Sequence, residues 1–147
     1  MRQARREDLP TIIAMLADDA LGRAREDAGP PINPAYADAF AAIEQDPNQF
    51  MAVLEDAGDV VGYLQLTFIP GLSMKGMLRG QIESVRIAAS RRGRGLGHLM
   101  LRWAIEECRR RGCGLVQLAM NKSRADTLRF YQSLGFVASH EGFKLRL

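Results

Sequence analysis

The segment from Val85 to His98 has the residue types and the spacing of a phosphate-binding loop. Its letters, V-R-I-A-A-S-R-R-G-R-G-L-G-H, predict a strand, a glycine-rich turn and the start of a helix. Glycines allow successive backbone N–H groups to point into one concavity, and the first turn of a helix adds unpaired N–H groups and the positive end of its dipole. The segment therefore predicts a site for a phosphate or pyrophosphate group, with a solvated basic turn as the alternative.

The glycine spacing excludes two common nucleotide motifs. The dinucleotide fingerprint G-x-G-x-x-G needs a third glycine where this chain has His98 or Met100, and the Walker pattern G-x-x-x-x-G-K-[ST] has no match. The segment does match R-x-x-G-x-G, at Arg92, Gly95 and Gly97. This pattern resembles the pyrophosphate-binding signature of the GNAT superfamily, the acetyl-CoA-dependent N-acetyltransferases. The same letters also resemble arginine-glycine tracts that bind RNA through charge.

The sequence on either side of the loop favours the enzyme. Residues 81–88 form a strand-like run, and residues 96–104 have apolar side chains at helical spacing, whereas an RNA-binding arginine-glycine tail would be disordered. A second resemblance lies further on, where Asn121, Tyr131 and the pair Gly135-Phe136 are similar to the helix that closes the cofactor site in the GNAT family. Two motifs in the right order make a chance match much less probable than either alone.

The resemblance implies how the cofactor acetyl-CoA would be bound. The backbone N–H groups of residues 92–98 would bind its pyrophosphate, with the arginine side chains as auxiliary charge. The exposed backbone of Val85 and Ile87 would pair with the pantetheine arm as an added strand. Asn121 would hydrogen-bond that arm from the far side, or would be an ordinary turn residue before a helix. The predicted cofactor-binding residues are Val85, Ile87, Arg92, Gly93, Arg94, Gly95, Leu96, Gly97, His98 and Asn121.

Tyr131 is predicted to act as the general acid. Attack of an amine on the acetyl carbonyl expels a thiolate, and a phenol near that sulfur can protonate it. Its place in the motif favours this role. The alternative is ordinary packing, because Tyr131 belongs to an apolar helical stripe with Phe130 and Leu134.

Glu83 is predicted to accept the proton that the amine loses. Strand alternation places it on the face of Val85 and Ile87, beside the predicted thioester. Two alternatives are a solvent-exposed glutamate paired with Arg79 or Arg86, and a relay of water molecules that replaces the base. No set of side chains has the spacing of a metal site.

Periodicity along the chain predicts the elements that position these residues. The expected order is a strand, two helices, three strands, a helix, a strand, a helix and two strands, the last pair being a hairpin of residues 136–139 and 143–147. Ser123 is expected to cap the last helix. The fold class is therefore α/β with a mixed sheet, which is the GNAT order. The resemblance implies a predominantly antiparallel sheet of about seven strands, splayed between strands 4 and 5 and flanked by about four helices, in one domain over residues 1–147.

Composition agrees with a small cytoplasmic protein. Apolar residues make up 47% of 147 residues, which is enough for one core without disulfide support, and the two cysteines are too few for a disulfide framework. Charges occupy residues 2–7, where a signal peptide would be apolar, and no run reaches membrane-spanning length. A net charge of +3 concentrated near the loop suits a polyphosphate ligand, and neither a nucleic acid nor a membrane is an expected partner.

These features predict transfer of the acetyl group of acetyl-CoA to a primary amine of a small molecule or peptide, by direct attack in a ternary complex. The alternatives are a CoA-binding regulatory protein without catalysis and an arginine-rich RNA-binding module. Acceptor specificity is expected from the first two helices and from loops 22–34 and 69–75, where Asp18 and Asp19 either attract a cationic amine or lie in solvent. A homodimer through the last strand is also expected.

Overall fold

The computed structural model describes residues 1–122 and 125–147 as a mixed sheet with helices on both faces. The N-terminal half contains β1 (Arg2–Gln3), a 3₁₀ turn (Arg6–Asp8), α1 (Leu9–Ala17), α2 (Ala20–Arg23), α3 (Pro34–Gln45), β2 (Gln49–Asp56) and β3 (Asp59–Ile69). The C-terminal half contains α4 (Ser73–Gly76), β4 (Arg79–Ile87), a second 3₁₀ turn (Ala89–Arg91), α5 (Leu96–Arg110), β5 (Leu115–Leu118) and α6 (Ala125–Gln132).

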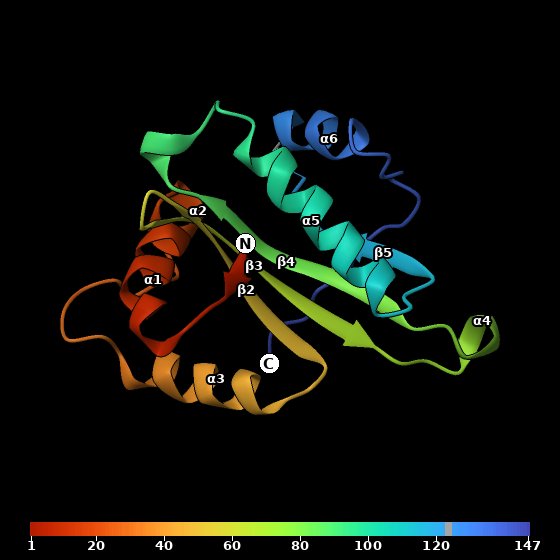
Figure 1. Cartoon of the computed structure of the whole chain (residues 1–147), viewed down its shortest axis with the longest axis horizontal. Helices are drawn as coiled ribbons and strands as arrows, with labels where there is room; N and C mark the ends of the chain where they lie inside the picture. Colours follow the sequence, from red (N-terminus) through yellow and green to blue (C-terminus); the bar gives the residue numbers. More distant parts are fainter. Residues whose placement is uncertain (123–124) are drawn as a thin grey trace.

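The five strands lie in the order in which they occur along the chain, β1-β2-β3-β4-β5. The first three pairings are antiparallel, and only β4 and β5 run parallel, joined by α5 as the crossover. Helices α5 and α6 lie on one side of this sheet, and α1 and α3 lie on the other (Figure 1). The predicted mixed and mainly antiparallel sheet is therefore confirmed.

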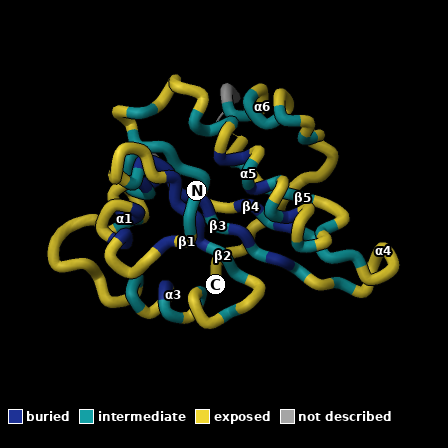
Figure 2. Tube along the Cα trace, viewed as in Figure 1, coloured by how far each residue is buried: buried dark blue, intermediate teal, exposed yellow. Residues whose placement is uncertain are grey.

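Each face of the sheet has its own apolar core. On the α5 face, Leu64, Leu66 and Ile82 from the strands pack with Met100 and Leu101 from α5. On the opposite face, the residues that pack together are Ile12, Ile13, Met15, Phe40, Val53 and Tyr63. Figure 2 shows the buried residues concentrated along the central strands, with exposed residues on the loops around them. None of the helices in the described ranges combines the length and the apolar character needed to cross a bilayer.

An irregularity in β4 opens the sheet between β4 and β5. The β3–β4 register runs from Gln65 opposite Glu83 to Tyr63 opposite Arg86, so β4 has one residue more than β3 in this interval. Ser84 within it has a φ of 54°, in the left-handed region. This is a β-bulge, which bends its strand and increases its twist. Beyond Ile82, β4 no longer pairs with β5, which confirms the predicted splay between strands 4 and 5.

The predicted closing hairpin is wrong: among the described residues no strand follows β5, and the sheet has five strands rather than about seven. The segment after α6 has the alternation of a strand, yet Phe143 is 92% exposed and Leu145 is 87% exposed. Strand-like alternation produces a strand only where a ladder partner is available, and residues 1–122 and 125–147 offer none to the tail. Ser123, the expected helix cap, lies outside the described residues.

Candidate functional site

The turn between β4 and α5 presents a row of backbone N–H groups. Gly93 and Gly95 have φ values of 76° and 75°, and a Cβ added to either would meet no atom of the described residues within 4 Å. The first N–H that closes the helix is that of Leu99, which donates to the Gly95 carbonyl at 3.2 Å. Among the described residues, the backbone N–H groups of residues 93–98 donate to no backbone acceptor. The turn is therefore an open cradle at a helix N-terminus, as an oxyanion requires.

Arg92 lies at the edge of this cradle rather than inside it. Its own N–H donates to the Ala89 carbonyl at 3.3 Å because the chain makes a 3₁₀ turn here. Its guanidinium donates to the Ile87 carbonyl at 3.0 Å and to the Asp18 carboxylate at 2.6 Å. The sequence-based expectation that the Arg92 N–H joins the cradle is thus not supported, while the guanidinium remains beside it.

Residues 83–87 form the open half of β4, which lies beyond the pairing with β5. This half presents backbone groups to the gap. Ala88 donates its N–H to Val61 of β3, and backbone groups alternate in direction along a strand, so those of Val85 and Ile87 point away from β3. Within the described part of the chain no strand pairs with them on that side, because the β4–β5 ladder ends at Ile82. Their side chains meanwhile pack with the α5-face core. On this edge the Val85 and Ile87 carbonyls accept from the Arg86 and Arg92 guanidinium groups, while the N–H groups have no strand partner among the described residues, in the position predicted for a pantetheine arm.

Glu83 lies on the α1 face of the sheet, whereas strand alternation predicts that it shares a face with Val85 and Ile87. Residues opposite each other in an antiparallel pair point to the same side, and Glu83 is opposite Gln65, which shares a face with Tyr63. The bulge at Ser84 inserts the extra residue that reverses the phase between Glu83 and Val85. Glu83 is exposed, and among the described residues it forms no ion pair with Arg79 or Arg86.

Tyr63 is a neighbour of Glu83 that the sequence analysis missed. Burial raises the pKa of this phenol to about 12, and the negative charge of Glu83 acts in the same direction. The phenol therefore stays protonated at neutral pH. Tyr63 could not be recognised from sequence, because a tyrosine at a buried position of an apolar strand looks like any other core residue.

Helix α6 packs against one end of the cradle, at Gly97 and His98. The ring of Phe130 lies against Gly97, where an added Cβ would come within 3.3 Å of it, and stacks edge-on with His98 at 4.7 Å between centroids. The His98 Nε2 is also 3.0 Å from the Ser133 hydroxyl. These contacts explain why Gly97 is a glycine. Phe130 and Ser133 were missed as parts of the site, although their spacing of three places them on one helical face.

Tyr131 and Asn121 lie on the elements that border the gap. The Tyr131 ring stands edge-on to Phe130 at 5.2 Å and to Phe136 at 5.9 Å, and it packs with the α5-face core to which Val85 and Ile87 belong. Asn121 is exposed in the connection between β5 and α6. Tyr131 and Glu83 are therefore on opposite faces of the open sheet.

Two aspartates connect the first helices to this site. Asp18 pairs with Arg92 at 2.6 Å, and Asp19 pairs with Arg86 of β4 at 3.8 Å. The Asp19 side chain also accepts from the Gly22 N–H at 2.6 Å, which caps α2. The two aspartates were expected either to attract a cationic amine or to lie in solvent. They are partly exposed, but both pair with arginines.

Residues 13–136 match the family described as the acetyltransferase (GNAT) family. The chain therefore belongs to the GNAT family, and it is an acetyltransferase. An aminoalkylphosphonate N-acetyltransferase of Salmonella typhimurium is 35% identical over 74% of this chain and 70% of its own length. A glucosamine 6-phosphate N-acetyltransferase of Trypanosoma brucei brucei is 34% identical over a stretch that covers 63% of this chain and 61% of the relative.

Among solved structures, one described as a transcriptional regulator from Bacillus halodurans C-125 is similar to this chain throughout. It is 45% identical, covers 99% of this chain and 97% of its own, and superposes with a TM-score of 0.96. The fold is therefore shared over essentially the whole chain, including the described part of the C-terminal segment.

Proposed function

We propose that this chain transfers the acetyl group of acetyl-CoA to a primary amine of a small molecule or peptide, by direct attack in a ternary complex. The observation that carries the proposal is the open row of N–H groups at residues 93–98 beside the unpaired edge of β4. A family assignment alone would leave the catalytic arrangement open. The cradle and the edge supply the two binding elements that one long phosphorylated thioester needs.

The residues present fit acetyl-CoA. The cradle offers N–H donors to a pyrophosphate, and the glycines at 93 and 95 leave the space in front of them clear. The N–H groups of Val85 and Ile87 offer strand-type bonds to an amide-containing arm. When bound, acetyl-CoA supplies the activated acetyl group. The protein supplies its placement, which can account for much of the rate of a two-substrate reaction.

One residue on each face of the sheet would carry one of the two proton transfers. Glu83, on the α1 face, would accept the proton of the incoming ammonium group, directly or through water. Tyr131, on the α5 face, would give a proton to the departing sulfur. The nitrogen loses its second proton as the amide forms, and this proton restores the phenol of Tyr131, so that one proton in total leaves to solvent through Glu83.

The relatives support a small amine as the acceptor. By their names, the Salmonella relative acetylates aminoalkylphosphonates and the trypanosomal relative acetylates glucosamine 6-phosphate. In this chain the acceptor would enter on the α1 face, where Glu83 is exposed and where α1 and α2 meet β4 through the Asp19–Arg86 pair. An entry from the α5 face would be obstructed by α6.

The test is a panel of primary amines with acetyl-CoA, read as release of free thiol and paired with calorimetry of CoA binding. We expect micromolar CoA binding and amine-dependent thiol release. CoA binding without release on any amine would instead support a CoA-binding regulator; the Bacillus halodurans structure is described as a transcriptional regulator. Failure to bind CoA would overturn the proposal.

We also propose that the exposed tail pairs with a second copy of the chain. Phe143, Leu145 and Leu147 alternate with Lys144 and Arg146, and the apolar members are almost fully exposed. The outer edge of β5 has no strand beside it among the described residues. Such exposed strand-like segments favour pairing with another chain. Sedimentation should give a dimer, and a chain truncated after Ser139 should sediment as a monomer; a full-length monomer at micromolar concentration would contradict this.

A further inference from the structure

Arg79, at the start of β4, has donors that the fold does not use. The residues paired with it on the flanking strands are Ile69 and Leu115. Its Nη1 donates to the Gln117 side-chain oxygen at 3.4 Å, which is long for a hydrogen bond. Its Nε is buried and has no hydrogen-bond partner among the described residues.

Other partly buried arginines of the described chain face carboxylates, whereas Arg79 does not. The shortest N–O distances are 2.7 Å from Arg2 to Asp8, 3.8 Å from Arg86 to Asp19, 3.3 Å from Arg91 to Asp56 and 2.8 Å from Arg111 to Glu107. Within the described ranges, no carboxylate oxygen lies within 4.0 Å of an Arg79 nitrogen. A partly desolvated cation without a counter-ion is costly, and an anion beside it removes that cost.

The side chain of Arg79 leans along the sheet toward the proposed reaction site. Arg79, Gln81 and Glu83 alternate onto the same face, opposite α5, since Gly80 and Ile82 between them face the α5 core. The bond from Arg79 reaches Gln117, which is level with Gln81 and donates to its side-chain oxygen at 2.8 Å. The guanidinium is thus about one strand alternation, roughly 7 Å, from the level of Glu83.

We propose that Arg79 binds an oxyanion of the acceptor, so that the preferred substrates are amines carrying a phosphonate, phosphate or carboxylate group about 7 Å from the nitrogen. This rests on the proposed function, because it places the acceptor nitrogen at Glu83. A guanidinium offers two parallel donors to an oxyanion, and the neighbouring glutamine amides can supply further ones. Arg79 is then a specificity-determining residue and takes no part in the proton transfers.

The test measures binding rather than turnover. Calorimetry would titrate 3-aminopropylphosphonate, 4-aminobutyrate and 3-amino-1-propanol into the CoA-loaded protein, which compares two oxyanions with an uncharged group. We expect the wild type to prefer both oxyanions over the alcohol. We expect Arg79→Gln to weaken phosphonate binding about tenfold or more while leaving the alcohol unchanged. Arg79→Lys should lose less, because it retains the charge without the fork.

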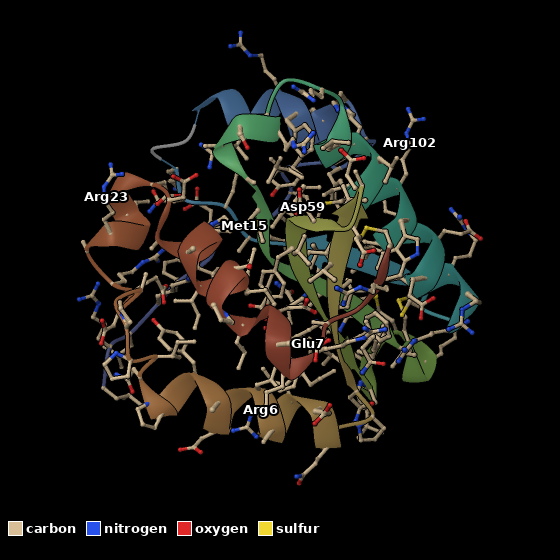
Figure 3. All side chains as sticks on the ribbon, turned by 60° about the vertical axis from the view of Figure 1, so that its left-hand side comes forward. Arg6, Glu7, Met15, Arg23, Asp59 and Arg102 are labelled. Atoms are coloured by element: carbon tan, nitrogen blue, oxygen red, sulfur yellow. The ribbon has the colours of Figure 1, made fainter. Side chains whose placement is uncertain are left out.

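Arg102→Gln is the matched control, because Arg102 is exposed on α5 and points into solvent (Figure 3). It should change none of the three affinities. Equal binding of oxyanions and alcohol by the wild type, or an equal loss of all three in Arg79→Gln, would overturn the assignment. A measured preference for oxyanions together with no thiol release would contradict the proposed function alone, so the two failures are distinguishable.

Discussion

The two halves of β4 belong to one continuous strand, but they have different neighbours in the sheet. Residues 79–82 are paired with β3 on one side and β5 on the other, and Ile82 is 2% exposed. Residues 83–87 are paired with β3 alone. The difference arises at Ser84, where one inserted residue bends the strand. A sheet can therefore expose a rigid backbone edge without a loop, because the closed half and the α5 core hold the open half in place.

The two halves also carry different parts of the proposed site. In the closed half, Gly80 allows α5 to approach, since a Cβ there would come within 2.4 Å of the Cys108 sulfur. This half is a fixed platform, and it carries Arg79. In the open half, Glu83 and the backbone of Val85 border the gap.

The largest effect is expected from Tyr131→Phe, which removes one hydroxyl on the α5 face of the open half. The ring contacts with Phe130 and Phe136 should survive. Loss of a general acid typically costs about 100-fold in rate, so kcat should fall by about that factor, with little change in the affinity for acetyl-CoA. Steady-state thiol release and calorimetry on the same variant check both parts. An unchanged kcat would remove Tyr131 from the mechanism.

Glu83→Gln changes the opposite face of the same half, and we expect kcat/KM to fall about 30-fold at pH 7. The glutamine cannot accept the proton of the ammonium group. As the pH rises toward the pKa of the amine, about 10, more acceptor is already neutral and the difference from wild type should narrow. Glu106→Gln, on the exposed surface of α5, is the control. A defect of constant size from pH 7 to 9.5 would count against a base at this position.

Gly95→Ala tests the cradle and should weaken acetyl-CoA binding about tenfold. The added methyl group would occupy the clear space in front of the N–H groups, and the left-handed φ of 75° would be strained by about 1–2 kcal/mol. Gly112→Ala is matched to it, because Gly112 has a φ of 80° and equally open surroundings at the other end of α5. Both variants should lose similar stability in denaturant unfolding. Only Gly95→Ala should change the dissociation constant, and an equal change in both would mean that strain alone was measured.

The cradle could be predicted from sequence because its signals are local, whereas the gap between β4 and β5 was expected only from the resemblance to the GNAT family. The glycines at 93 and 95 stand where a left-handed backbone is needed, and the apolar spacing after them predicts the helix. The bulge could not be predicted, because the left-handed residue is Ser84 and not a glycine. One unrecognised insertion was enough to place Glu83 on the wrong face.

Features that depend on distant partners were also missed. Alternation in the tail predicted two strands, but a strand needs an edge to pair with, and the pattern does not say which chain supplies it. The lack of a carboxylate near Arg79 and the contact of Phe130 with Gly97 depend on packing between segments far apart in the sequence. Neither has a signal at sequence level.

The smallest effect is expected at Asp18, which connects α1 to the cofactor side of the open half. Its carboxylate holds the Arg92 guanidinium at 2.6 Å, on a part of the surface where such pairs contribute little to stability. In Asp18→Asn, Arg92 becomes available to the pyrophosphate, and we expect acetyl-CoA to bind two- to threefold more tightly at low salt, with the gain lost at high salt.

The same substitution in an Arg92→Gln background separates this effect from a general change of charge. If Asp18 acts by restraining Arg92, Asp18→Asn should have no effect in that background. A gain that persists there would mean that the aspartate simply repels the cofactor from a distance. The ion pair itself would then have no part in setting the affinity for acetyl-CoA.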